Sequence, residues 1–164
     1  MAGFLSWRSR TNFTARVAAF GLLGGLVATL AYDGSRSILF WLGIVSQPFR
    51  SIEQWGVLIA GSDYPEFAPW VGWLFHFWNG STFGMFFAVA FGRPNILKGI
   101  LWGLFLELAL VIASPKLLLL TIRGELLTSS FIGHVAYGTA LALIVARAHQ
   151  QLVSQKRADH ADTD

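Results

Sequence analysis

The chain contains no cysteine, and only 13% of its 164 residues are charged. The absence of cysteine excludes disulfide bonds, thiolate metal sites and cysteine nucleophiles. An average soluble domain has about 25% charged residues, and here the uncharged residues gather in long runs. The basic residues flank these runs instead of clustering on one polar face, which argues against nucleic-acid binding. These absences predict a membrane protein.

Hydrophobic residues make up 54% of the chain, and four stretches of them are long enough to cross a bilayer: residues 13–32, 70–91, 96–120 and 130–148. A spanning helix needs roughly 20 mostly apolar residues. The first stretch lacks a clean signal-peptide cleavage site, which favours a retained anchor. The run "GRPN" (92–95) predicts a tight turn, so the second and third stretches are expected to form a helical hairpin.

The distribution of basic residues predicts the orientation, because cytoplasmic flanks of membrane helices carry an excess of lysine and arginine. With the N-terminus inside, eight basic residues lie on the inner side (Arg8, Arg10, Arg16, Arg93, Lys98, Arg147, Lys156, Arg157) and four on the outer side (Arg36, Arg50, Lys116, Arg123). We therefore expect both termini in the cytoplasm. Residues 1–150 are predicted to form one transmembrane domain. The polar tail, residues 151–164, is expected to extend the last helix briefly and then become disordered.

Between the first two stretches, apolar residues recur every three or four positions: Ile38, Trp41, Val45, Phe49, Ile52, Trp55 and Ile59. Polar residues fill the intervening positions. This pattern predicts an amphipathic helix over about residues 35–60, kinked at Pro48, that lies in the outer membrane interface.

Two pairs of motifs suggest an internal repeat. "HFWNGSTFG" (76–84) and "HVAYGTALA" (134–142) share a histidine, then a glycine four residues later, then a hydroxyl residue. The first and third stretches each contain Gly-x-x-x-Gly, at residues 21–25 and 99–103. The chain is therefore predicted to be all-α, with two tandem hairpins of transmembrane helices. Small residues let helices approach closely in lipid, so we expect seven glycines at helix contacts: Gly21, Gly25, Gly80, Gly84, Gly99, Gly103 and Gly138.

Five polar residues in these stretches are candidates for binding a ligand or an ion: His76, Asn79, Glu107, His134 and Tyr137. Each histidine lies about six residues below the outer end of its stretch, or roughly 10 Å deep, so both are expected at one level. Helical spacing places Asn79 beside His76 and Tyr137 beside His134. The same arithmetic places Glu107 roughly 7 Å deeper. A carboxylate in the bilayer is costly, so Glu107 should face the bundle interior, pair with another group or stay protonated.

The histidines and Glu107 are compatible with several roles. They could form a structural network, bind a metal, haem or another planar ligand beside the glycines, or relay protons or small solutes. Catalysis is disfavoured, because the chain has no recognisable nucleophile and base set, acidic metal motif or phosphate loop. The sequence therefore assigns no catalytic residue and leaves any metal or cofactor open.

In order along residues 70–147, "HFWNGSTFG", "GILWGLF", Pro115 and "GHVAYGTAL" form a pattern that resembles uncharacterised small bacterial membrane proteins of the YagU-like type. The chain departs from that pattern at Leu141-Ala142, where a second glycine is expected. The resemblance implies a four-helix protein of the bacterial inner membrane, and it carries no activity.

The leading expectation for function is a non-catalytic accessory or scaffold subunit, in contact with lipid and with other membrane-protein chains. The lack of a soluble domain and the seven tryptophans favour this role. The alternative is a carrier or binder of an ion, a proton or a small ligand that uses His76, Glu107 and His134.

Overall fold

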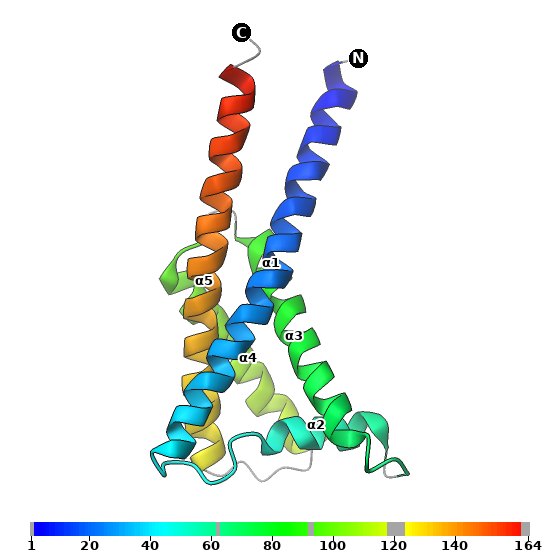
Figure 1. Cartoon of the computed structure of the whole chain (residues 1–164), viewed down its shortest axis with the longest axis vertical. Coiled ribbons are helices and arrows are strands. Elements are labelled where there is room, and N and C mark those ends of the chain that lie inside the picture. The colour runs from blue at the N-terminus through cyan, green and yellow to red at the C-terminus, as the bar shows by residue number, and fades with distance from the viewer. Residues whose placement is uncertain (1, 62, 92–93, 118–123, 162–164) are drawn as a thin grey trace.

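The computed structural model describes residues 2–61, 63–91, 94–117 and 124–161. These residues form five helices: α1 (Ala2–Trp41), α2 (Arg50–Ala60), α3 (Ala68–Ala90), α4 (Ile96–Leu117) and α5 (Gly124–Ala161). Four of them run along the long axis, whereas the short α2 lies across the end opposite both termini (Figure 1). The all-α fold predicted from the sequence is therefore confirmed.

Three helices are long and apolar enough to cross a membrane, over Thr14–Trp41 of α1, Ile96–Ala113 of α4 and Leu127–Gln155 of α5. α3 has 23 residues, which is also a spanning length. It is not among the three, because histidine, asparagine, glycine and hydroxyl residues interrupt its apolar run. Three of the four predicted spans are thus supported by length and composition.

Local signals mark several helix boundaries. Asn95 precedes α4, and its side-chain oxygen accepts a hydrogen bond of 2.9 Å from the backbone N–H of Lys98, as an N-cap residue does. Pro69 lies in the first turn of α3, where its missing N–H costs no helical hydrogen bond. α2 ends at Gly61, which has a φ of 82°, a conformation that glycine adopts without steric cost.

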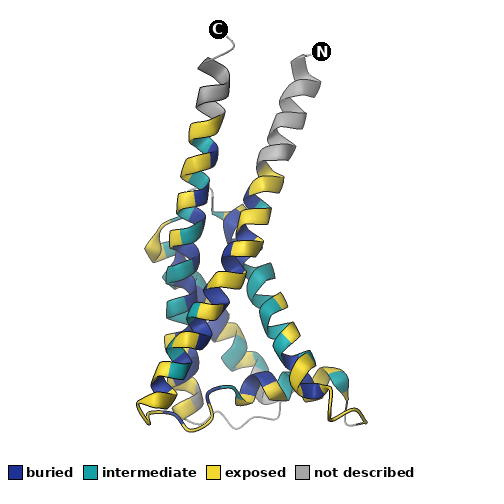
Figure 2. Cartoon of the chain, viewed as in Figure 1, coloured by how far each residue is buried: buried dark blue, intermediate teal, exposed yellow. Residues whose placement is uncertain are grey.

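Glycine contacts join the long helices in two pairs, α1 with α3 and α4 with α5. Gly21 and Gly25 of α1 lie against Gly80 and Gly84 of α3, so closely that a methyl group on any of the four would collide with the neighbouring helix. In the second pair, Gly99 and Gly103 of α4 lie against the backbone of α5 between His134 and Gly138. α1 and α5 also pack against each other, and the buried core lies between the two pairs (Figure 2).

The hairpin predicted for the second and third stretches corresponds to α3 and α4. These helices follow each other in the chain, but they are not among the described helix pairs with extensive contacts. Near their connection, the rings of Phe87 and Phe91 each lie 6.2 Å from that of Trp102 on α4. Other contacts between the two helices are few, because the glycine face of α3 is turned to α1 and that of α4 to α5. Residues 92–93 of the connecting run lie outside the described residues.

The interfacial helix is shorter than predicted. α1 continues to Trp41, so Ile38 and Trp41 belong to α1, and only the 11 residues of α2 remain for the surface helix. Pro48 lies in the connection before α2 and kinks no helix. Gly43 allows the turn after α1, with a φ of 70°. Arg36, which the sequence places on the outer side, belongs to α1, and its side chain is fully buried.

The polar tail also differs from its prediction, because α5 continues through Ala161. Leu152 is buried in the core cluster, so the helix keeps a packing face beyond the predicted domain end at residue 150. Residues 162–164 of the predicted disordered tail lie outside the described residues.

Candidate functional site

Two pairs of a histidine and a carboxylate occupy equivalent places in the two helix pairs. In the first, Nε2 of His76 on α3 lies 3.0 Å from Oδ1 of Asp33 on α1. In the second, Nδ1 of His134 on α5 lies 2.7 Å from Oε2 of Glu107 on α4. Every long helix therefore contributes one ionisable side chain, and each pair joins the two helices that the glycines hold together.

Each pair fixes which imidazole nitrogen carries hydrogen. Nδ1 of His134 also lies 3.0 Å from the backbone oxygen of Ser130, which can only accept, so this nitrogen donates. The Ser130 hydroxyl donates to the same oxygen of Glu107. For His76, Nε2 donates to Asp33. In the neutral imidazoles, Nε2 of His134 and Nδ1 of His76 are consequently acceptors.

The repeat has a different register from the one predicted. Asp33 follows Gly25 by eight residues, and Glu107 follows Gly99 by eight. Gly25 lies against Gly80 and Gly84, and Gly99 lies correspondingly against Gly138 and Ala142. Gly25 is therefore equivalent to Gly99, not to Gly103. Once the helices are aligned in this way, Asp33 and Glu107 fall at equivalent positions.

The depth predicted for Glu107 is wrong. Nδ1 of His134 lies 2.7 Å from Oε2 of Glu107, so the two side chains are at the same level. The prediction began the fourth stretch at residue 130, whereas α5 is already helical at Gly124, and His134 therefore lies further along its helix than expected.

Tyr32 of α1 lies between the two histidines. The centroid of its ring is 5.6 Å from that of His76 and 4.9 Å from that of His134. Its hydroxyl accepts a hydrogen bond of 3.2 Å from Nη1 of Arg36, whose guanidinium also lies over the rings of Tyr32 and Phe49. The two imidazoles thus reach a common centre, at the level that the repeat predicts.

The centre contains several buried polar atoms without a hydrogen-bond partner among the described residues: Oδ2 of Asp33, Oε1 of Glu107, and Nε and Nη2 of Arg36. Isolated charges are expensive to bury. Here two carboxylates, one guanidinium and two titratable imidazoles lie within one cluster, so they compensate each other's charge in part.

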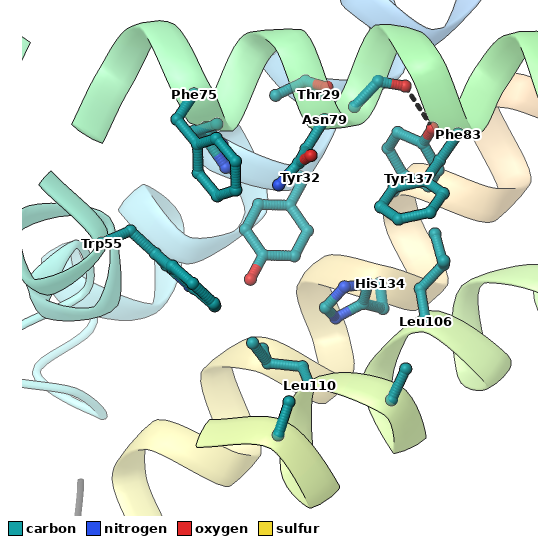
Figure 3. A pocket seen from close by; sticks show the side chains of 14 residues that line it. Thr29, Tyr32, Trp55, Phe75, Asn79, Phe83, Leu106, Leu110, His134 and Tyr137 are labelled. Carbon is teal, nitrogen blue, oxygen red and sulfur yellow. Dashed lines mark hydrogen bonds between the residues drawn. The ribbon is translucent and has the colours of Figure 1, made fainter. Parts of the chain in front are cut away.

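A cavity of about 290 Å³ adjoins this centre. Its wall includes both histidines and Tyr32, with Phe75, Asn79 and Phe83 from α3 and Leu106 and Leu110 from α4 (Figure 3). Trp55 of α2 lies at one end of the cavity (Figure 3). A smaller cavity of about 100 Å³ shares Trp55, Phe75, His76, Asn79 and Leu110 with it. The wall is therefore mainly aromatic and aliphatic, with a few polar groups.

The five residues predicted for the site lie in one region, but not with the predicted partners. Asn79 lines the cavity and is not the partner of His76. Tyr137 donates a hydrogen bond of 2.6 Å to the backbone oxygen of Gly80, which connects α5 to α3 (Figure 3). Glu107 pairs with His134.

Sequence reasoning missed Tyr32, Asp33, Arg36 and Ser130. Residues 33–36 follow the first predicted span, which ends at residue 32, and lead into the predicted surface helix, where charged side chains need no partner. The signal that could have found Asp33 is its spacing from Gly25, which matches the spacing of Glu107 from Gly99.

The arrangement does not favour a metal site. Within the described part of the chain, no three histidine or acidic side chains are grouped so that they could hold a metal ion. The arrangement can instead offer two imidazole acceptors beside a cavity. No protein-family model, curated protein sequence or solved structure matches the chain.

Proposed function

We propose that the chain is a four-span protein of the bacterial inner membrane, with α3 as the fourth span and both termini in the cytoplasm. The length of α3 and its glycine contact with the apolar helix α1 support a spanning position. The excess of basic residues near the end that carries both termini supports the orientation. The pattern shared with YagU-like proteins supports the bacterial membrane.

Within that membrane, the protein binds a small ligand in the cavity between α3 and α4. The observation that carries this function is the cavity of about 290 Å³ with both histidines in its wall. Small-molecule sites are typically concave and mostly apolar, with a few polar groups that orient the ligand, and measure roughly 300–1,000 Å³. The cavity is at the lower end of that range, so it suits one or two fused rings better than a haem.

The ligand reaches the cavity from the bilayer. The side chains of α3 and α4 form two opposite walls, and the two helices are not among the described pairs with extensive contacts. A route between them leads to the acyl chains, because the neighbouring side chains Leu74, Trp78 and Leu108 are exposed and apolar. A ligand dissolved in lipid would therefore need no aqueous path.

A cavity-filling substitution tests this function. Ala109 lines the cavity, whereas its neighbour Leu108 does not line it and is 58% exposed. In lipid nanodiscs, a naphthalene probe should bind saturably to the wild type and to Leu108→Trp, and Ala109→Trp should abolish binding. Binding would be measured by probe fluorescence with empty nanodiscs subtracted. No saturable binding by the wild type, or equal binding by the two variants, would refute the function.

An accessory-subunit role is a second candidate, favoured by the position of α4. Among the described helices α4 packs extensively only with α5, so a wide apolar face has no protein neighbour: Leu97, Leu101, Phe105, Leu108 and Ile112. A helix of another chain could cover this face. Purification in mild detergent should then recover other membrane chains in fixed stoichiometry. Recovery of the monomer or homodimer alone would count against this role.

A further inference from the structure

The two histidines line the cavity, whereas Asp33 and Glu107 do not. Thr29, Tyr32, Asn79 and Tyr137 add hydroxyl and amide groups to the wall, and the hydroxyls of Thr29 and Tyr137 donate to backbone oxygens. Each carboxylate instead accepts from one imidazole nitrogen, Nε2 of His76 or Nδ1 of His134. The hydrogen bonds of the described residues leave the other nitrogens, Nδ1 of His76 and Nε2 of His134, without a partner.

These two nitrogens are strong acceptors when the imidazoles are neutral. A carboxylate that accepts from one imidazole nitrogen fixes the tautomer and leaves the other nitrogen as an acceptor. The wall therefore presents two imidazole acceptors and no carboxylate oxygen. A ligand with hydrogen-bond donors matches these two nitrogens.

The rest of the wall selects for a flat ring. Tyr32, Phe75, Phe83 and Trp55 contribute aromatic surfaces, and aliphatic side chains of α4 complete the wall (Figure 3). Aromatic rings prefer offset-stacked or edge-to-face contacts with one another. Because the two imidazoles come from equivalent positions in the two helix pairs, they can serve donors at two different edges of one ring.

From these observations we infer that the cavity binds a membrane-soluble aromatic alcohol, such as a phenol or a hydroquinone, whose hydroxyl groups donate to Nδ1 of His76 and Nε2 of His134. This inference rests on the proposed ligand-binding function and names the class of the ligand. It requires no covalent or redox step.

A pair of probes with the same shape tests the class. A dihydroxynaphthalene and the dimethylnaphthalene with the same substitution pattern have nearly equal size, but only the first has donors. One hydrogen bond contributes about five-fold in affinity, so two bonds should make the hydroxylated probe about 25-fold tighter. Affinities would be measured in phosphatidylcholine nanodiscs and referred to the probe concentration in the bilayer.

Two variants test the assigned atoms. His76→Gln keeps a donor at the position of Nε2 for Asp33 and removes Nδ1. His134→Asn keeps a donor at the position of Nδ1 for Glu107 and removes Nε2. Each variant should lower the affinity for the hydroxylated probe about five-fold and leave the affinity for the methylated probe unchanged.

The outcomes separate the two proposals. If neither probe binds to the wild type, both the ligand-binding function and this inference fail. If the wild type binds both probes equally, the function stands and the inference is overturned. Unchanged affinity in folded variants would also overturn it. Thermal unfolding in the same nanodiscs shows whether each variant is folded. If a variant does not fold, the comparison of the two probes on the wild type still tests whether the cavity prefers a hydroxylated ligand.

Discussion

Gly80→Ala is expected to weaken the contact between α1 and α3 by displacing a single side chain. The three atoms nearest to a methyl group on Gly80 all belong to Thr29: Oγ1, which would overlap with it, Cβ at 3.1 Å and Cγ2 at 3.4 Å. Thr29 is buried, and its hydroxyl donates to the backbone oxygen of Gly25 at 2.8 Å. Overpacking of this kind costs about 1–3 kcal/mol in the free energy of unfolding.

Thr29→Ala should rescue much of that loss, because it removes Oγ1 and Cγ2 and leaves only Cβ in slight contact. By itself, Thr29→Ala should cost about 1 kcal/mol for the lost hydrogen bond. The double variant should therefore be more stable than the sum of the two single effects predicts, by about 1–2 kcal/mol. The measurement is equilibrium unfolding in mixed detergent, followed by circular dichroism.

Gly25→Ala provides the matched control. A methyl group at Gly25 would meet only backbone atoms of α3, at Gly80, Ser81 and Gly84. No side-chain substitution can relieve that overlap, so Thr29→Ala should not rescue it. Strictly additive effects of Gly80→Ala and Thr29→Ala would refute the reasoning, and so would equal rescue of Gly25→Ala.

Two further predictions concern the ion pairs and the orientation. His134→Leu should lower the free energy of unfolding by about 3–5 kcal/mol, because Glu107 is left buried without its imidazole partner. Adding Glu107→Leu should recover part of that loss. A double variant no more stable than His134→Leu, in a thermal or detergent unfolding assay, would contradict this expectation. Because the chain has no cysteine, Glu66→Cys and Ser154→Cys each create a unique thiol at an exposed position. In intact bacterial spheroplasts an impermeant maleimide should label Cys at position 66 but not at position 154, and the reverse pattern would invert the proposed topology.

Much of the architecture could be predicted from the sequence, because it depends on local patterns. The apolar runs predicted α1, α4 and α5 as membrane-length helices, and the shared motifs predicted that the first two long helices and the last two form equivalent pairs. The boundaries were less accurate. α1 extends beyond residue 32 because charged residues that would end a span in isolation, Asp33 and Arg36, are buried by other helices.

The candidate site was predicted only in part. His76, Glu107 and His134 were identified because a single polar group in an apolar run is conspicuous. Asp33 was missed because it lies where the run ends, among residues that could equally belong to a loop. Its pairing with His76 depends on the register of α1 against α3, which close glycine contacts determine.

By itself, the sequence determined the helical class, the apolar lengths and the places where helices approach closely, because each depends on residue type and spacing along one helix. Only the tertiary structure decided which carboxylate meets which histidine, that Tyr32 lies between the two histidines, and that a cavity lies between α3 and α4. Those features depend on the register of each helix against its neighbours. If two helices that pack through their glycines shifted by one turn against each other, the sequence pattern of each helix would be unchanged. The polar side chains that face each other across the contact would nevertheless be different.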